Sequence, residues 1–209
     1  MVNRRNKPIW TVPRIWSNAD CFILGGGPSL KEIDVSRLTG SRVIAVNNAY
    51  RLGSWIDVLY FGDCRWYNWH KKELLQFAGL KVTTCEQHVD KPGIKVVRRK
   101  NAPHGLQTNP AFLGWNLSSG ACAINLAVHL GAKRIVLLGY DMRKVEGQCN
   151  FHDDYPHSRN KDPYKRFLVP FPTIAADLKK KHIECLNACP GSALTVFPIV
   201  DPGKVVPRC

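Results

Sequence analysis

Short apolar runs separated by polar or glycine-rich segments divide the chain, and most have the length of a buried strand. They lie at residues 20–24, 42–48, 57–63, 134–141 and 182–187. Longer stretches with the length and spacing of helices lie at 66–77, 117–131 and 164–181. Strands that alternate with helices are typical of a parallel sheet covered on both sides. The pattern therefore predicts an α/β fold, a Rossmann-like, mostly parallel sheet with helices on both faces.

Two segments lack this periodicity. Residues 143–163 are polar, rich in His and Asp, and long for a connection inside a compact domain, so we expect a lid over a functional site. Residues 1–18 are basic and contain proline, and they predict an N-terminal arm. The remaining residues, 19–209, have the length of a single domain with one core.

Polar residues and glycines follow the ends of the predicted strands. They are Gly25, Gly26, Gly27, Ser29, Asn47, Asn48, Asp63, Asp141 and Ser192. Ligands of open parallel sheets bind beyond these carboxyl ends. Glycine allows a phosphate to approach backbone N–H groups, and helices starting after Gly27 and Ser119 would add positive dipole ends. A cleft for a nucleotide or phosphosugar is the prediction. A purely structural tight turn is the alternative for GGGPS, which is neither G-x-G-x-x-G nor a Walker A loop.

The composition indicates a class of binding partner. The 209 residues include 30 Lys and Arg against 16 Asp and Glu, which gives a formal charge of +14. Such a field attracts polyanions such as nucleic acid, although basic runs can also be solvated faces. A hydrophobic content of 44% excludes disorder as the main state. We find no 18-residue apolar run and no secretory signal, so we expect a cytoplasmic protein without a membrane span, whose eight scattered cysteines are reduced thiols.

Five strings resemble those of the small bacterial sialyltransferases, and of compact glycosyltransferase-like proteins often encoded by phages. They are GGGPSLKEIDVSRL (25–38), VNNAY (46–50), SSGACAINLAVHLGAKRIVLLGYD (118–141), HSRNKD (157–162) and CPGSAL (189–194). The first is the most specific, and matching is weak between Arg65 and Leu117. The resemblance implies a glycosyltransferase that moves a sugar from a nucleotide-activated donor to an acceptor hydroxyl with inversion. A phage-encoded protein would act in the host cytoplasm.

The resemblance also implies site residues. His157, in the His-Ser-x-Asn-x-Asp string, would deprotonate the acceptor, a role that suits an imidazole near neutral pH. The nucleotide and donor would contact Gly25, Gly26, Gly27, Pro28, Ser29, Asn47, Ser119 and Gly120, with Pro190 and Ser192 closing the far side.

Three departures from the family's pattern concern the donor. Gly26 stands in place of an asparagine, and Asp63 stands where an amide is expected. Arg143 stands where a lid tyrosine is expected. A carboxylate in the donor site repels the carboxylate of sialic acid, and an arginine favours a diphosphate leaving group. We therefore expect Asp63 and Arg143 in the donor site and a donor other than sialic acid.

No metal is required in this interpretation, although Asp63 and Asp141 could bind a divalent ion together with a nucleotide diphosphate. Zinc on His152, Asp153, Asp154 or His157 with a cysteine is disfavoured, because the spacing is uncommon. The aromatic residues Trp66, Tyr67 and Trp69 could stack a sugar or base, but their helical spacing is more typical of core.

For the acceptor, the charge favours nucleic acid, for example a hydroxylated base in phage DNA that is flipped or single-stranded. Arg98, Arg99, Lys100 and Arg159 are the predicted acceptor-binding residues. Two alternatives stay open: a non-catalytic nucleic-acid-binding protein with a transferase-like fold, and another nucleotide-dependent transferase. The sequence does not determine the oligomeric state.

Overall fold

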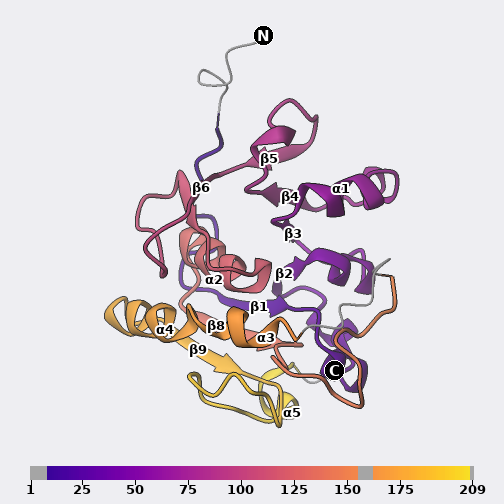
Figure 1. Ribbon diagram of the computed structural model, residues 1–209, viewed down its shortest axis with the longest axis vertical. Helices are drawn as coiled ribbons and strands as arrows, with labels where there is room; N and C mark the ends of the chain where they lie inside the picture. The colour runs from indigo at the N-terminus through magenta and orange to yellow at the C-terminus, as the bar shows by residue number, and fades with distance from the viewer. Residues whose placement is uncertain (1–8, 155–161, 208–209) are drawn as a thin grey trace.

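The computed structural model describes residues 9–154 and 162–207 and is built on a seven-stranded parallel sheet (Figure 1). Its strands are β1 (Asp20–Leu24), β2 (Arg42–Val46), β3 (Val58–Phe61), β4 (Leu80–Thr83), β5 (Ile94–Val96), β8 (Arg134–Leu138) and β9 (Glu184–Asn187). Their order is β5-β4-β3-β2-β1-β8-β9, and every pair is parallel. Strands β6 (Arg98–Lys100) and β7 (Phe112–Gly114) form a separate parallel pair.

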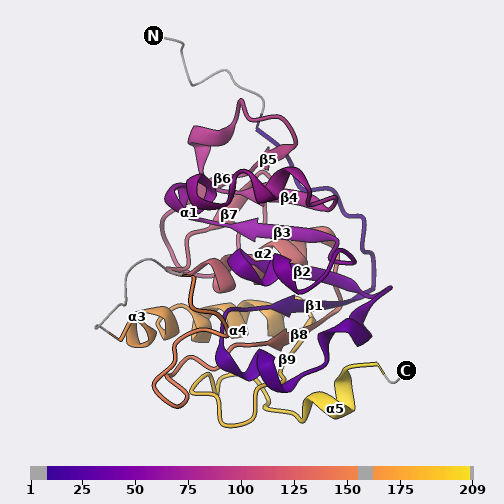
Figure 2. The same ribbon diagram turned by 90° about the vertical axis from the view of Figure 1, so that its right-hand side faces the viewer.

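Helices cover both faces of this sheet (Figures 1 and 2). The α-helices are α1 (Cys64–His70), α2 (Ser119–Leu130), α3 (Tyr164–Leu168), α4 (Phe171–Lys180) and α5 (Pro202–Val205). Short 3-10 helices are η2 (Pro28–Glu32), η3 (Val35–Leu38), η4 (Asn47–Leu52), η5 (Glu73–Leu75) and η6 (Glu86–His88). The predicted fold class is confirmed.

Side-chain alternation along the strands divides the core into two layers. In β1, Cys21 and Ile23 pack with α2 and α4, whereas Phe22 and Leu24 pack with the 3-10 helices and α1. Successive residues of a strand point to opposite faces of the sheet and so contribute to both layers, as expected for a sheet buried on both faces. Residues 9–18 of the predicted arm join the first layer, where Val12 and Trp16 are buried. The folded unit therefore begins earlier than the sequence predicts.

The predicted helix at 117–131 is confirmed in detail. Ser118 caps α2 by accepting a hydrogen bond from the Ala121 N–H, and Gly131 ends the helix with a φ of 107°. The helix predicted at 164–181 is instead divided into α3 and α4 around Pro170, whose ring cannot continue the hydrogen-bond ladder. The helix predicted at 66–77 begins and ends earlier, as α1.

Strands β4 and β5 were not predicted, because their three or four residues are too short to show a period. Strand β1 lies between β2 and β8, so the chain builds the sheet outward from β1 in two directions. The carboxyl ends of the strands around this point form the place where open sheets bind ligands. Within the described residues, the helices are all too short or too polar to cross a membrane.

Candidate functional site

A cavity of about 770 Å³ opens at the carboxyl ends of β1, β2 and β3, within the usual size range of ligand sites. Its other walls are the N-terminus of α2, part of the segment 143–154, and α3. Seven of the predicted donor-site residues line it: Gly25, Gly26, Gly27, Asn47, Asp63, Ser119 and Gly120. Pro28, Ser29, Arg143, Pro190 and Ser192 do not line it.

The glycine turn after β1 is packed against the turn after β8. The N–H groups of Gly25 and Gly27 donate to the carbonyls of Leu138 and Gly139, at 2.7 and 2.8 Å. A Cβ on Gly25 would lie 2.5 Å from the Gly139 carbonyl oxygen. The sequence predicted that these N–H groups would bind a phosphate, but they instead hold the two turns together. The helix that follows is the five-residue 3-10 helix η2, without the dipole of a long α-helix.

Asp141 and Ser192 are structural parts of the same turn. The Ser29 hydroxyl and N–H both donate to the Asp141 carboxylate, with Oγ···Oδ2 at 2.8 Å. The buried Ser192 hydroxyl donates to the Tyr140 carbonyl at 2.6 Å and braces the turn from the other side. The sequence predicted that Ser29 and Ser192 bind the donor. Their hydroxyls instead form these hydrogen bonds within the protein.

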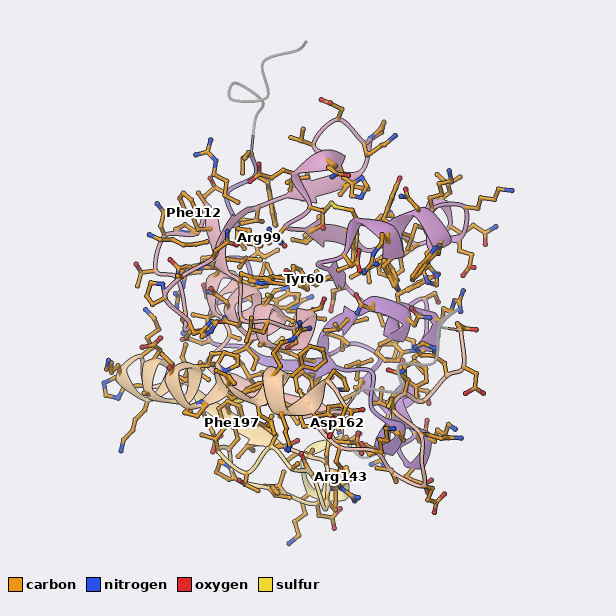
Figure 3. All side chains as sticks on the ribbon, in the orientation of Figure 1. Tyr60, Arg99, Phe112, Arg143, Asp162 and Phe197 are labelled. Atoms are coloured by element: carbon orange, nitrogen blue, oxygen red, sulfur yellow. A yellow bond between two sulfur atoms is a disulfide. The ribbon has the colours of Figure 1, made fainter. Side chains whose placement is uncertain are left out.

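Arg143 lies outside the cavity, contrary to prediction. Its Nε donates to the Gly191 carbonyl at 2.5 Å, so the guanidinium fixes the 190–192 loop. Figure 3 shows Arg143 and Arg99 toward opposite ends of the molecule. Among the described residues, the cations that line the cavity are Arg65, Lys144 and Arg166. Lys144 and Arg166 lie in the segments that the sequence marked as a lid and the following helix, but nothing in the pattern distinguished them from Arg143.

Asn47 has an unused polar atom in the cavity wall. Its backbone has a φ of 51°, a conformation that asparagine tolerates, at the end of β2. The side-chain oxygen is buried and has no hydrogen-bond partner among residues 9–154 and 162–207. A buried acceptor left unpaired costs about 1–3 kcal/mol, and a ligand N–H or O–H would remove that cost.

The N-terminus of α2 meets the cavity at Ser118, Ser119 and Gly120. Tyr140 holds it in place, because its hydroxyl donates to the Gly120 carbonyl at 3.0 Å and its ring packs against Gly120, where a Cβ would lie 3.1 Å from the ring. Burial raises the pKa of Tyr140 well above its ordinary value, so the hydroxyl keeps its proton. A twelve-residue helix presents a substantial positive dipole end to an anion here.

Asp63 faces the cavity but is paired with Arg65. Its carboxylate accepts from the Arg65 N–H at 2.8 Å, which caps α1, and from the guanidinium at 3.0 Å. The Asp141 carboxylate is likewise bonded, to Ser29. Neither belongs to the only group of three or more metal-binding side chains in the described part of the chain. Both carboxylates that the sequence allowed as divalent-ion ligands are thus engaged in bonds within the protein.

Segment 143–154 is attached to the sheet at several points. Phe151 N–H donates to the Gly26 carbonyl at 3.0 Å, and Asn48 Nδ2 donates to Asp154 at 3.3 Å. Asp154 also forms an ion pair with Arg51. The Asp154 N–H donates to His152 Nδ1 at 3.2 Å. Burial lowers the pKa of His152, and Arg51 adds to this shift while Asp154 opposes it.

Three tryptophans line the cavity. Of the rings for which the sequence favoured a core position, Trp66 is buried, Tyr67 is partly buried and packed against the core, and Trp69 is exposed. Trp66 is 2% exposed and donates from Nε1 to Asn48, whereas Trp69 is 49% exposed. Trp115 was not predicted as a site residue, because it lies in the weakly matching part of the chain. The Arg99 guanidinium stacks over Trp115, 4.8 Å from the ring centre.

Arg98, Arg99 and Lys100 are exposed on β6 and do not line the cavity themselves. The Arg99 guanidinium stacks on Trp115, which does line the cavity. His157 and Arg159 lie outside the described residues. Tyr164, which sequence reasoning missed, lines the cavity from α3 and donates to the Cys149 carbonyl at 2.9 Å.

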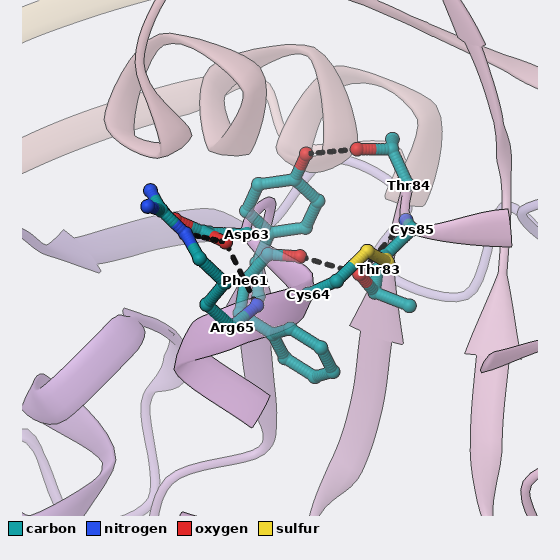
Figure 4. The surroundings of a disulfide bond; sticks show 8 residues. Phe61, Asp63, Cys64, Arg65, Thr83, Thr84 and Cys85 are labelled. Carbon is teal, nitrogen blue, oxygen red and sulfur yellow. Dashed lines mark hydrogen bonds and ion pairs between the residues drawn. A yellow bond between two sulfur atoms is a disulfide. The ribbon is translucent and has the colours of Figure 1, made fainter. Parts of the chain in front are cut away.

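Cys64 and Cys85 form a disulfide, so the expectation of reduced thiols is wrong for this pair (Figure 4). It joins the start of α1 to the residue two positions beyond β4. Five cysteines are free thiols in the described residues: Cys21, Cys122, Cys149, Cys185 and Cys189.

Comparison with solved structures relates this architecture to known enzymes. The sialyltransferase CstII from Campylobacter jejuni, in complex with cytidine-5'-monophosphate, is 20% identical over 89% of this chain and 86% of its own, with a TM-score of 0.58. The chain has a sialyltransferase-like fold. The monofunctional α-2,3-sialyltransferase Cst-I from the same organism is 15% identical over 92% of this chain and 83% of its own, with a TM-score of 0.61.

A third similar structure is the MAf glycosyltransferase from Magnetospirillum magneticum AMB-1, with a TM-score of 0.68 at 11% identity. It covers 96% of this chain, which spans 37% of that protein. Neither a protein-family model nor a curated protein sequence matches the chain. The shared property is thus the fold of sialyltransferases and glycosyltransferases.

Proposed function

We propose that this protein is a glycosyltransferase that binds a nucleotide-activated sugar in the cavity and transfers the sugar to an acceptor hydroxyl with inversion. The observation that carries the proposal is the unpaired, buried Asn47 amide oxygen in a cavity that also contains the N-terminus of α2. The amide suits the base or ribose of a nucleotide, and the helix end suits its phosphate. The similar CstII structure is described as a complex with a substrate analogue, cytidine-5'-monophosphate.

The charges of the cavity support a phosphate leaving group. Arg65, Lys144 and Arg166 line it, against Asp63 and Asp153. In the transfer, the acceptor oxygen bonds to the anomeric carbon while the bond from that carbon to the phosphate oxygen breaks. The negative charge that develops on the phosphate is stabilised by the α2 N-terminus and these cations.

His157 is the proposed base that receives the acceptor proton. His152, which lines the cavity in the described residues, accepts a hydrogen bond at Nδ1, so its neutral ring carries the proton on Nε2. That ring cannot take a second proton without losing the Asp154 bond. His152 thus has a positioning role in segment 143–154, which we propose as a lid.

A polyanionic acceptor, such as a hydroxylated base in nucleic acid, is supported by β6. Its three consecutive cations are exposed, and Arg99 stacks on Trp115 at the cavity edge. An arginine and an aromatic ring together suit a stacked base and its phosphate. Arg159 in the lid would contribute a further cation.

The pairing of Asp63 with Arg65 changes the expectation about the donor. An isolated carboxylate would repel sialic acid, but the Arg65 guanidinium compensates part of this charge. Calorimetric competition among CMP, CMP-sialic acid, UDP-hexoses and GDP-hexoses tests the proposal and identifies the donor. We expect one nucleotide to bind and its sugar conjugate to be turned over. Failure of every nucleotide to bind would contradict the proposal.

The base is tested with His157→Ala once a donor and acceptor are known. Turnover should fall about 10²–10⁴-fold, the usual contribution of a general base, with nucleotide affinity unchanged. His182→Ala is the matched control, since His182 is exposed and does not line the cavity. Full turnover by His157→Ala would remove His157 from the mechanism.

A further inference from the structure

Three metal-binding side chains meet beside the cavity, at the ends of β3 and β4. They are Cys64 at the first position of α1, Cys85 after β4, and His88 in η6. One ligand atom from each lies within 4.8 Å of the other two. None of the three lines the cavity, so the proposed sugar transfer does not use them.

The His88 imidazole has no internal function that explains its position. The residue is 5% exposed, and both ring nitrogens are buried without a hydrogen-bond partner in the part of the chain that the structure describes. The Cys64 backbone is near enough to influence the ring, but the geometry of a hydrogen bond is not met. An unpaired buried polar group is destabilising, and a ligand at this nitrogen would remove that cost.

Backbone and side-chain bonds hold the two sulfur atoms toward each other (Figure 4). The Thr83 hydroxyl donates to the Phe61 carbonyl at 2.6 Å and accepts from the Cys85 N–H at 3.0 Å. These bonds tie the end of β4 to the end of β3. On the other side, the Asp63 carboxylate caps the helix that begins with Cys64. The sulfur positions therefore depend on the sheet and helix as well as on the disulfide.

Aromatic rings surround the histidine. The centre of the Tyr67 ring is 4.2 Å from that of His88, and the centre of Phe61 is 6.2 Å away. These contacts restrict the orientation of the imidazole. They also exclude water, and a dry, ordered shell strengthens metal binding by the ligands inside it.

We infer that the reduced protein binds one zinc ion through Cys64, Cys85 and His88. Thiolate and imidazole are the ligands that Zn²⁺ prefers, and three protein ligands leave the fourth tetrahedral position for water. Hard ions such as Mg²⁺ prefer oxygen and are not expected here. Only modest movement would bring ligand atoms within 4.8 Å of one another into contact with a common ion.

The zinc site and the disulfide are alternative states of the same cysteines. A phosphine reductant converts the disulfide to two thiols, taking up oxygen from water to become the phosphine oxide. Zinc binding then releases the two thiol protons to solvent. In either state the start of α1, with Asp63 and Arg65 at the cavity, stays connected to β4.

The test uses the full-length protein, reduced with a phosphine and freed of excess reductant, and titrated with Co²⁺ and then Zn²⁺. We expect one equivalent of Co²⁺ to give a thiolate-to-cobalt charge-transfer band and tetrahedral d–d bands, both abolished by one equivalent of Zn²⁺. Cys64→Ser and His88→Ala should each lower the affinity at least about 100-fold, because even outer-sphere partners contribute about 10–100-fold.

Two controls separate metal binding from other effects. Cys149→Ser and His182→Ala remove a free cysteine and an exposed histidine elsewhere, and should bind zinc like the parent. The oxidised protein, with its disulfide intact, should bind none. Should a ligand variant fail to fold, mass spectrometry of the parent decides: zinc should slow alkylation of Cys64 and Cys85 but not of Cys149. Equal alkylation with and without zinc, or equal Co²⁺ spectra of the parent and His88→Ala, would overturn the inference.

Discussion

The packed turns after β1 and β8 and the ends of β2 and β3 lie at the same cavity but use their polar groups differently. On the β1–β8 side, Ser29 bonds to Asp141, and the Gly25 and Gly27 N–H groups bond to carbonyls after β8. On the β2–β3 side, the Asn47 amide oxygen is unpaired and Arg65 is exposed. The β1–β8 side is closed by its own hydrogen bonds. The β2–β3 side keeps the Asn47 amide oxygen without a partner among the described residues, although Asp63 and Arg65 bond to each other there.

This difference shows why a glycine-rich string is a weak indicator of phosphate binding. Glycine is needed at Gly27 because a Cβ would lie 1.9 Å from Asp141 Oδ2. Close packing imposes this requirement, and it selects glycine at the same positions as a phosphate-binding loop would. The stronger indicator is a polar atom in the cavity that the protein itself does not satisfy.

The largest expected effect concerns the β1–β8 side, where the polar groups are already bonded within the protein. Gly27→Ala places a methyl group against the Asp141 carboxylate and the Gly139 carbonyl, 2.7 Å away, and should lower the free energy of unfolding by about 3 kcal/mol. Gly26→Ala is the matched control. Its Cβ meets only Asn150 Oδ1 at 3.3 Å, so the change should be within about 0.5 kcal/mol. Equal urea midpoints for the two variants would contradict this account of the turn.

A second prediction concerns β6, which we propose as the acceptor surface next to the cavity. Replacing Arg98, Arg99 and Lys100 together with glutamine should reduce the salt dependence of DNA binding, lowering the log–log slope by about 2–3, because each lost phosphate contact removes about 0.9. The control with the same change of charge replaces Lys179, Lys180 and Lys181 near the end of α4. Fluorescence anisotropy over a salt series measures both. Identical slopes for the two triple variants would exclude β6 as the acceptor surface.

Asn47→Gly and Ser192→Ala compare the two sides directly. Glycine accepts the backbone of Asn47, and the change removes a buried acceptor without a partner, so stability should not fall, while nucleotide affinity should fall about tenfold through loss of one hydrogen bond. Ser192→Ala should show the reverse: about 1–2 kcal/mol less stability and unchanged affinity, because its hydroxyl bonds only within the protein. Calorimetry and urea denaturation give both quantities. A loss of affinity in Ser192→Ala alone would reverse the assignment of the two sides.

The smallest effect concerns pH and the lid. The folded-state pKa of His152 is lowered, so its contribution to stability is complete above the ordinary pKa of about 6.5 and is lost as pH falls below it. Protonation at Nδ1 also removes the acceptor of the Asp154 N–H. Hydrogen exchange in residues 143–154 should therefore accelerate, relative to α2, between neutral pH and pH values below the ordinary pKa. His152→Gln should remove this dependence, and a persistent one would assign it to another group.

Much of the architecture was determined by the sequence itself. Apolar runs predicted β1, β2, β3, β8 and β9, and the capping residues Ser118 and Gly131 predicted the bounds of α2 closely. Polar residues after the strands predicted where the cavity lies, because parallel strands bring their carboxyl ends to one edge. These features follow from local periodicity and from the geometry of a parallel sheet.

Tertiary structure alone decided which polar groups are already paired. Ser29 and Asp141 are 112 residues apart, and their hydrogen bond converts two predicted ligand contacts into internal ones. Arg143 turns to Gly191 while Lys144, its neighbour, lines the cavity. Cys64, Cys85 and His88 come together although their spacing follows no familiar metal motif. Periodicity determines which face of an element is buried, but the direction and partner of each polar side chain depend on segments brought near only when the sheet is complete.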